Sequence, residues 1–190
     1  MLLLVGLGNP GSNYTNTRHN IGFKIIDAIN SHFKLSKQKP KFKGLLTTGN
    51  IDEKKIYAIK PLTFMNNSGT AIKELIDYFK IDAKDVFVFH DDMDIDFGKI
   101  KAKFGGSSAG HNGIDSIDKF IGKDYSRVRI GIGHPKQKNK VNNHVLEDFK
   151  EDEEEKIKEI AENIVKLIPT LIEKKMDLFS SKVNQNLNGI

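Results

Sequence analysis

The 190-residue sequence contains no cysteine and no tryptophan, and its apolar runs are short. The absence of cysteine excludes disulfide bonds, thiolate zinc sites, iron–sulfur clusters and a cysteine nucleophile, and it fits a reducing compartment. No apolar stretch approaches the ~18 residues of a membrane helix. The apolar N-terminus is too short for a signal peptide and lacks a charged lead-in and a small-residue cleavage site. We therefore expect a soluble, cytoplasmic protein without a membrane anchor.

Length and charge give a second set of expectations. A chain of this size predicts one domain over residues 1–190 that buries about 70% of the surface of its unfolded chain. The sequence has 30 lysines and arginines against 25 acidic residues, a formal net charge of +5. Because acidic residues cluster between 147 and 162, the remainder is more basic than this total suggests. Nucleic acid is a candidate partner, although a lysine-rich solvated surface explains the charge equally well.

Strand and helix patterns alternate along most of the chain. The period-2 and short apolar runs predict strands over 1–6, 45–51, 55–60, 85–90, 99–104 and 127–133. Helical spacing predicts helices over 21–32, 68–79, 111–122 and 150–168. This alternation predicts an α/β fold: a single three-layer domain with a twisted mixed, largely parallel sheet and helices on both faces.

The ends and links of these elements carry further expectations. Asn20 and Ser68 are expected to cap the first two helices. Residues 34–44 and 105–110 are expected to be links, and a basic loop with Lys136, Lys138 and Lys140 follows the last strand. Pro169 is expected to end the long helix, followed by a shorter helix to Phe179 and a frayed tail of ten residues.

A long polar loop, within VGLGNPGSNYTNTRHNIG over residues 5–22, joins the first strand to the first helix. Loops on a rigid scaffold concentrate binding and chemistry, so we expect one wall of a site here. GLGNPG matches the glycine pattern of dinucleotide-binding proteins, whose third glycine opens a helix. Here Pro10 precedes that glycine, nine polar residues delay the helix, and no acidic residue stands where a ribose would need it. A dinucleotide site is therefore not expected.

His19 stands just before the first helix, and Asp91 follows the buried strand 85–90. Imidazole titrates near pH 6.5 and can take a proton from water at cellular pH. Asp91 lies at the carboxyl end of a strand, where open α/β sheets place ligands, and could accept the other ring N–H of His19. Taken singly, an exposed histidine and a turn-capping aspartate explain the two residues as well. No serine is placed as a nucleophile, so water is the candidate.

Three asparagines, Asn9, Asn66 and Asn112, each occupy a loop beside a predicted strand end or helix start. Each alone is typical of a turn or cap. Converging on one cleft, their amides could donate to a developing oxyanion or bracket a peptide group.

Two further patterns leave alternatives open. Lys103 and Arg129 lie on strands that alternate basic and apolar residues, which suits either a protected sheet edge or contacts to nucleic-acid phosphates. His90, Asp91, Asp92 and Asp94 are metal-ligand types, but no His-x-x-x-His or His-x-His spacing occurs. A metal-dependent hydrolase and an RNA-binding module without chemistry are the alternatives to a metal-free hydrolase.

Five motifs together resemble, in order and spacing, the bacterial-type peptidyl-tRNA hydrolases: GLGNPG…YTNTRHNIG, KPLTFMNNSG, HDDMD, GGSSAGHNG and RVRIGIGHP. The likeness covers about residues 1–150. It implies a monomeric esterase without metal or cofactor. Such an enzyme cleaves the ester between a peptidyl group and the terminal ribose of tRNA, and so recycles tRNA from peptides that dropped off the ribosome.

The resemblance also implies roles for individual residues. His19 would be the catalytic base and Asp91 its partner. Asn9, Asn66 and Asn112 would bind the peptide backbone, the ribose end and the attacking water. Tyr14 and Met65 would line the cleft, and Lys103 and Arg129 would clamp phosphates of the acceptor stem.

Overall fold

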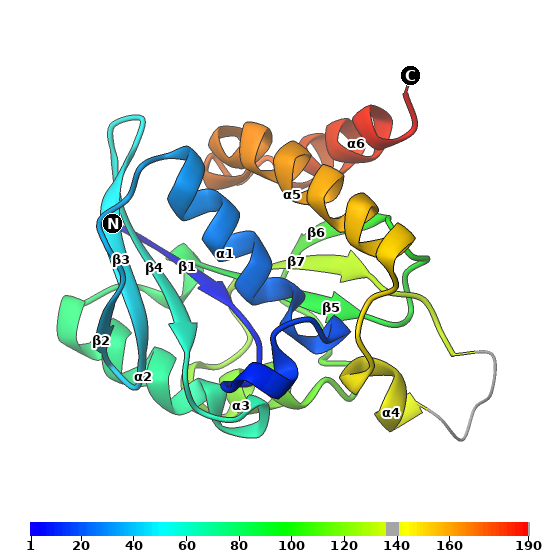
Figure 1. Ribbon diagram of the computed structural model, residues 1–190. Helices are drawn as coiled ribbons and strands as arrows, with labels where there is room; N and C mark the ends of the chain where they lie inside the picture. The colour runs from blue at the N-terminus through cyan, green and yellow to red at the C-terminus, as the bar shows by residue number, and fades with distance from the viewer. Residues whose placement is uncertain (136–140, 190) are drawn as a thin grey trace.

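The computed structural model describes residues 1–135 and 141–189, and within them the strands form one seven-stranded sheet in the order β2-β3-β4-β1-β5-β7-β6 (Figure 1). The strands are β1 (Leu2–Gly6), β2 (Lys39–Lys41), β3 (Gly44–Ile51), β4 (Lys54–Pro61), β5 (Val86–Asp92), β6 (Ile100–Phe104) and β7 (Ser126–Gly131). β1 pairs in parallel with β4 and β5, and β5 with β7. The pairs β2–β3, β3–β4 and β6–β7 are antiparallel. The predicted mixed sheet is confirmed.

Helices cover both faces of this sheet. They are α1 (Ile21–His32), α2 (Ser68–Phe79), α3 (Asn112–Ile121), α4 (Val141–Leu146), α5 (Glu151–Ile172) and α6 (Met176–Leu187). Helices α1, α5 and α6 share one apolar core with the sheet, and α2 and α3 share the other. Figure 1 shows α1 and α5 side by side over the first face. The three-layer prediction is confirmed.

The central strand β1 shows why a sheet covered on both faces needs apolar residues without alternation. Leu2 and Leu4 enter the core of α1 and α5, whereas Leu3 and Val5 enter the core of α2 and α3. Parallel strands buried in this way read as continuous apolar runs.

The C-terminal expectations were wrong. Helix α5 continues through Pro169 to Ile172, and α6 occupies most of the tail that was expected to fray. Proline removes one backbone hydrogen bond, but Ile168, Leu171 and Ile172 are buried around it. Packing in this core outweighs the local preference of proline for a helix end.

Helix α6 also covers the edge strand β6. The Asn184 side chain accepts from the Ile100 N–H and donates to the Ile100 carbonyl, both at 2.9 Å. Ser180 Oγ accepts from the Ala102 N–H at 2.8 Å. These side chains replace a neighbouring strand, so this edge is closed to further pairing.

Two local expectations also differ from the structure, and a third is not tested by it. Residues Lys39–Lys41, expected in a link, form the edge strand β2. Ser68 is the first residue of α2 rather than its cap, and its hydroxyl donates to the Met65 carbonyl at 2.9 Å. The basic loop with Lys136, Lys138 and Lys140 lies outside the described residues. Across residues 1–135 and 141–189, none of the helices combines the length and apolarity needed to cross a membrane.

Candidate active site

Two close backbone approaches bring the first helix over the ends of the central strands. A Cβ at Gly22 would overlap the backbone of Leu7 and Phe89, and one at Gly6 would overlap Gly22. Only glycine permits α1 to begin this close to β1 and β5. The turn before α1 therefore holds His19 directly over the carboxyl end of β5.

Asp91 is the buried carboxylate at that position, with 1% of its surface exposed. His19 Nδ1 lies 2.8 Å from Asp91 Oδ1 and 3.0 Å from Oδ2. Burial alone would lower the pKa of His19, but the charge and hydrogen bond of Asp91 outweigh it and raise this pKa above the usual value. Because Nδ1–H donates to Asp91, the lone pair of Nε2 is directed away from the carboxylate.

His111 is a second imidazole on the same carboxylate. Its Nε2 lies 3.0 Å from Asp91 Oδ1, while its Nδ1 accepts the N–H groups of Gly113 and Ile114 at the start of α3. An acceptor Nδ1 leaves the proton on Nε2, so the contacts define the tautomer of His111. The pKa of Asp91 is lowered: its burial favours the neutral acid, but His19 and His111 together outweigh that effect.

A third imidazole, His90, lies behind His111, with the two ring centroids 4.9 Å apart. Its Nδ1 is 2.8 Å from the Asp91 carbonyl oxygen. Burial, together with the nearby His111, lowers the pKa of His90 to about 3. This ring is therefore neutral at cellular pH, and it adds no positive charge to the site.

A cavity of about 250 Å³ opens in front of His19 and Asp91. Its walls come from the end of β5, the loop before α3, the start of α3 and helix α4. The lining residues are His19, Asp91, Asp92, Met93, Asp94, Ser108, Ala109, Gly110, His111, Asn112 and Val145. Asn112 is thus brought to the same cavity as His19.

Asn9 is not among the residues that line this cavity, and it belongs to a buried hydrogen-bond network. Asn20 Oδ1 accepts from the Asn9 N–H at 2.8 Å, and Asn20 Nδ2 donates to the Asn9 carbonyl at 2.9 Å. Asn9 Oδ1 accepts from the Met65 N–H at 2.8 Å. The expectation that Asn20 caps α1 with its side chain was therefore wrong. The side chain fixes the backbone of Asn9 instead. The side-chain amide nitrogen of Asn9 is oriented away from Met65 N by this contact.

The other residues expected in the cleft, Tyr14, Met65 and Asn66, do not line the cavity of His19 either. Met65 is buried, and a Cβ at Gly113 would come within 2.5 Å of its sulfur, so Met65 packs on the start of α3. Asn66 follows it and is exposed. Tyr14 is half-buried and meets the exposed ring of Phe64 edge to face, with the centroids 6.5 Å apart.

Lys103 and Arg129 lie near the β6 edge of the sheet. Lys103 is half-buried, and desolvation together with Arg129, Arg127 and Lys101 lowers its pKa. Arg129 Nε donates to Asp92 Oδ2 at 2.7 Å. Arg127 is buried and holds the loop before α3, since it donates to the Ser107 carbonyl at 2.8 Å and to Asp118 at 2.9 Å.

Arg18 is a site neighbour that sequence reasoning missed. Its buried guanidinium donates to the carbonyls of Glu147 and Asp148 at 3.2 and 3.1 Å and to Glu153 at 2.8 Å. It therefore joins the turn that carries His19 to the segment between α4 and α5. The arginine–acid pair spans 135 residues, so no local pattern could reveal it.

His19, Asp91 and His111 are also the one cluster within the described part of the chain that could hold a metal ion, with ligand atoms within 4.8 Å of one another. A metal there would compete with the hydrogen bonds already made. His111 Nε2 carries the proton that it donates to Asp91, because its Nδ1 accepts two backbone N–H groups. The hydrogen-bonded arrangement fits two imidazoles and one carboxylate without an ion.

A buried carboxylate that orients an imidazole at the carboxyl end of a parallel sheet is the arrangement of a hydrolytic enzyme. Comparisons with known proteins agree. A family model described as peptidyl-tRNA hydrolase matches residues 3–189. The peptidyl-tRNA hydrolase of Pelagibacter ubique (strain HTCC1062) is 71% identical over 97% of this chain and 99% of its own. That of Bartonella henselae is 45% identical over 100% of this chain and 98% of its own.

A solved structure shares the fold. The crystal structure of peptidyl-tRNA hydrolase from Acinetobacter baumannii is 34% identical, covers 97% of this chain and 94% of its own, and superposes with a TM-score of 0.90. This chain belongs to the peptidyl-tRNA hydrolase family. It is an ester hydrolase that cleaves peptidyl-tRNA. The family match extends beyond residue 150, where the sequence motifs end, and includes α5 and α6.

Proposed function

We propose that His19 is the general base of this hydrolysis and that Asp91 is its orienting partner. The contact that carries the proposal is the 2.8 Å approach of His19 Nδ1 to Asp91, which leaves Nε2 to take a proton from water. The water attacks the ester carbonyl. Asp91 stabilises the imidazolium that forms, without becoming protonated itself.

The developing oxyanion needs a donor in the same cavity. Two N–H groups at the start of α3, those of Gly113 and Ile114, are already taken by His111 Nδ1. The side-chain amide of Asn112, which lines the cavity, is therefore the donor we assign. The ribose hydroxylate then leaves and takes the proton held by His19. A ribose alkoxide is a far better leaving group than an amine anion, and this difference accounts for the preference for cleaving an ester rather than an amide.

The remaining cleft residues would bind the two ends of the substrate. Asn9, fixed by Asn20 and Met65, would bind the peptide backbone, and Asn66 the ribose end. Tyr14 and Met65 would form an apolar wall beside them.

Lys103 and Arg129 would bind phosphates of the acceptor stem. Support comes from the position of Lys103 beside Arg129, Arg127 and Lys101. Desolvation first, and then repulsion from these cations, lowers the pKa of Lys103, and a bound anion would offset that repulsion. Arg129 would bind through its terminal nitrogens, since its Nε is committed to Asp92.

At the level of the cell, we propose a cytoplasmic monomer, with residues 1–190 as one domain, that recycles tRNA from prematurely released peptidyl-tRNA. The family relationship and the absence of cysteine support this proposal.

The direct experiment is incubation with N-acetyl-aminoacyl-tRNA in excess chelator, with release of free tRNA as the measurement. We expect full turnover in chelator. A loss of turnover in chelator would favour the metal-dependent alternative instead. A tRNA mobility shift without deacylation would favour an RNA-binding module without chemistry.

A further inference from the structure

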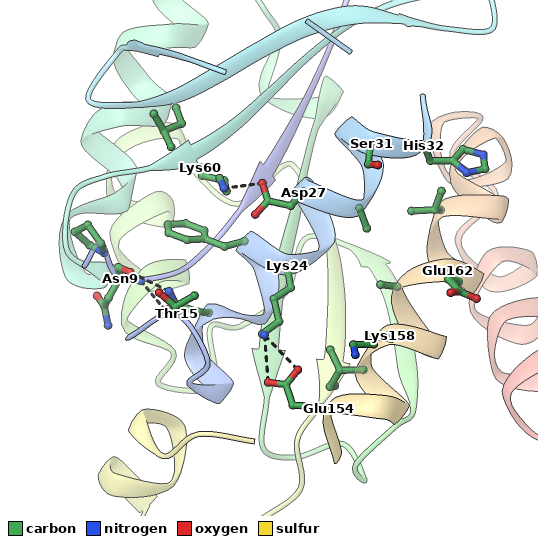
Figure 2. A pocket seen from close by; sticks show the side chains of 18 of the residues that line it. Asn9, Thr15, Lys24, Asp27, Ser31, His32, Lys60, Glu154, Lys158 and Glu162 are labelled. Carbon is green, nitrogen blue, oxygen red and sulfur yellow. Dashed lines mark hydrogen bonds and ion pairs between the residues drawn. The ribbon is translucent and has the colours of Figure 1, made fainter. Parts of the chain in front are cut away.

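A second and larger cavity, of about 1040 Å³, lies over the outer surface of α1 (Figure 2). One side is formed by the ends of β3 and β4, and the other by α5. We call this cavity the α1 groove. Its apolar lining includes Phe23, Ala28, Leu45, Leu62, Ile157 and Val165. None of the residues to which the proposed chemistry is assigned, except Asn9, belongs to it.

The α1 groove begins next to the catalytic turn. Two of its lining residues, Asn9 and Asn20, are hydrogen-bonded to each other, and Asn20 directly follows His19 in the chain. The groove and the catalytic cavity share no lining residue, so a substrate group must pass Asn9 to reach the groove from the ester carbonyl. The exposed side chain of Leu62 also lines the groove.

Charges on the rim of the groove are mixed rather than basic. Lys60 pairs with Asp27 at 2.6 Å, and Lys24 pairs with Glu154 at 3.2 Å. Figure 2 shows these pairs on opposite flanks of α1, with Lys158 and Glu162 on α5. The lining holds four lysines and three carboxylates, so it lacks the strong excess of positive charge that contacts to a phosphate backbone require. An apolar floor with a rim of both signs instead suits a polypeptide of varied side chains.

The length of the groove sets how much peptide it can hold. Its α1 lining runs from Asn20 to His32, which at ~1.5 Å per helical residue spans about 18 Å. An extended peptide rises ~3.3 Å per residue, so about five residues fit alongside. Ala28 lies about 12 Å from Asn20 along the helix, beyond the reach of a single aminoacyl group.

We propose that the α1 groove binds the peptidyl part of the substrate, as an extended chain of about five residues that leaves the ester past Asn9. This inference rests on the proposed function, because it places the scissile ester at His19. It assigns the groove to one ligand class, a polypeptide of unrestricted sequence. Binding there adds affinity for longer peptides and takes no part in the chemical step.

The test compares two substrates on the same tRNA: an N-acetyl-aminoacyl group and an N-acetylated six-residue peptide with the same C-terminal residue. Two variants obstruct the groove, Ala28→Trp at its middle and Ser31→Trp towards its far end. Ser31 is exposed, so a tryptophan there is compatible with folding even if Ala28→Trp is not. The matched control is Lys119→Trp, on the exposed surface of α3 across the sheet.

We expect both groove variants to raise KM for the six-residue substrate roughly tenfold, with kcat and the short substrate little changed. The Lys119→Trp control should change neither. A six-residue KM within about twofold of the control in both variants would overturn the proposal. An equal rise in KM for both substrates would overturn it as well, since the short substrate does not reach the obstruction. Failure of the proposed function would be distinguishable from failure of the groove proposal, because the parent enzyme would then not deacylate even the short substrate.

Discussion

His111 and Asp91 share a hydrogen bond of 3.0 Å, and Asp91 accepts from His19 through the same oxygen, Oδ1. One carboxylate thus orients two imidazoles that have different roles. Within the described residues His19 bonds through Nδ1 alone, so Nε2 is directed to the cavity, whereas both nitrogens of His111 are used. His111 therefore acts on Asp91 and on the start of α3 rather than as a base.

The double role of His111 can be separated by two substitutions. Asparagine can cap the start of α3 but is too short to reach Asp91. Alanine can neither cap the helix nor bond Asp91. We expect His111→Asn and His111→Ala to lower kcat about tenfold alike. His111→Ala should lose about 1 kcal/mol more in the free energy of unfolding, measured in urea. Unchanged kcat in both variants would show that His111 does not position Asp91.

The pH dependence of kcat/KM should report the pKa of His19. Burial lowers this pKa, but the charge and hydrogen bond of Asp91 raise it overall, so the acidic limb should lie above pH ~6.5. Activity falls as pH falls through this value, since a general base must be unprotonated. In Asp91→Asn the limb should move to lower pH, and kcat should fall by roughly 10³ or more. If the acidic limb of Asp91→Asn stays at the parental pH, Asp91 does not raise the pKa of the group that titrates.

Arg18 should matter for stability far more than a comparable exposed cation. Its guanidinium is buried and donates to three backbone carbonyls and one carboxylate, whereas the Lys24–Glu154 pair is partly solvated. Arg18→Gln should lower the free energy of unfolding by about 3 kcal/mol, and Lys24→Gln by about 0.5 kcal/mol. Urea unfolding measures both. Equal small losses would contradict the role of Arg18 in joining the catalytic turn to α5.

The phosphate contacts should appear in the salt dependence of KM. Lys103→Ala and Arg129→Ala should each raise KM and reduce the slope of log KM against log salt by about 1, with kcat little changed. The matched control is Lys84→Ala, which should leave the slope unchanged. Lys84 lies in the turn before β5, whereas the proposed site lies at the carboxyl end of β5. If both variants have the same slope as the parent, Lys103 and Arg129 do not bind phosphates of the tRNA.

The fold and the His19–Asp91 pair could be predicted because both follow from local pattern and sheet geometry. Apolar runs locate the buried strands, and a polar loop after β1 must meet the end of the neighbouring parallel strand β5. Strand β5 itself ends at Asp92 rather than His90, so Asp91 lies within the strand.

Features that depend on distant contacts were missed or misassigned. Asn20 looked like a helix cap because asparagine favours that position, yet its side chain bonds the backbone of Asn9, eleven residues away. His111 was recognised only as a helix start, because its bond to Asp91 joins residues 20 positions apart. Pro169 and the tail after Phe179 were misassigned because burial against the sheet decides their conformation.

The most direct measurement is single-turnover hydrolysis of N-acetyl-aminoacyl-tRNA by His19→Ala, with the tRNA affinity of the same variant measured in parallel. If His19 is the base, the rate falls by at least ~10² while the Kd for tRNA stays within about twofold of the parent's. Hydrolysis at nearly the parental rate would contradict the central claim that the His19–Asp91 pair activates water.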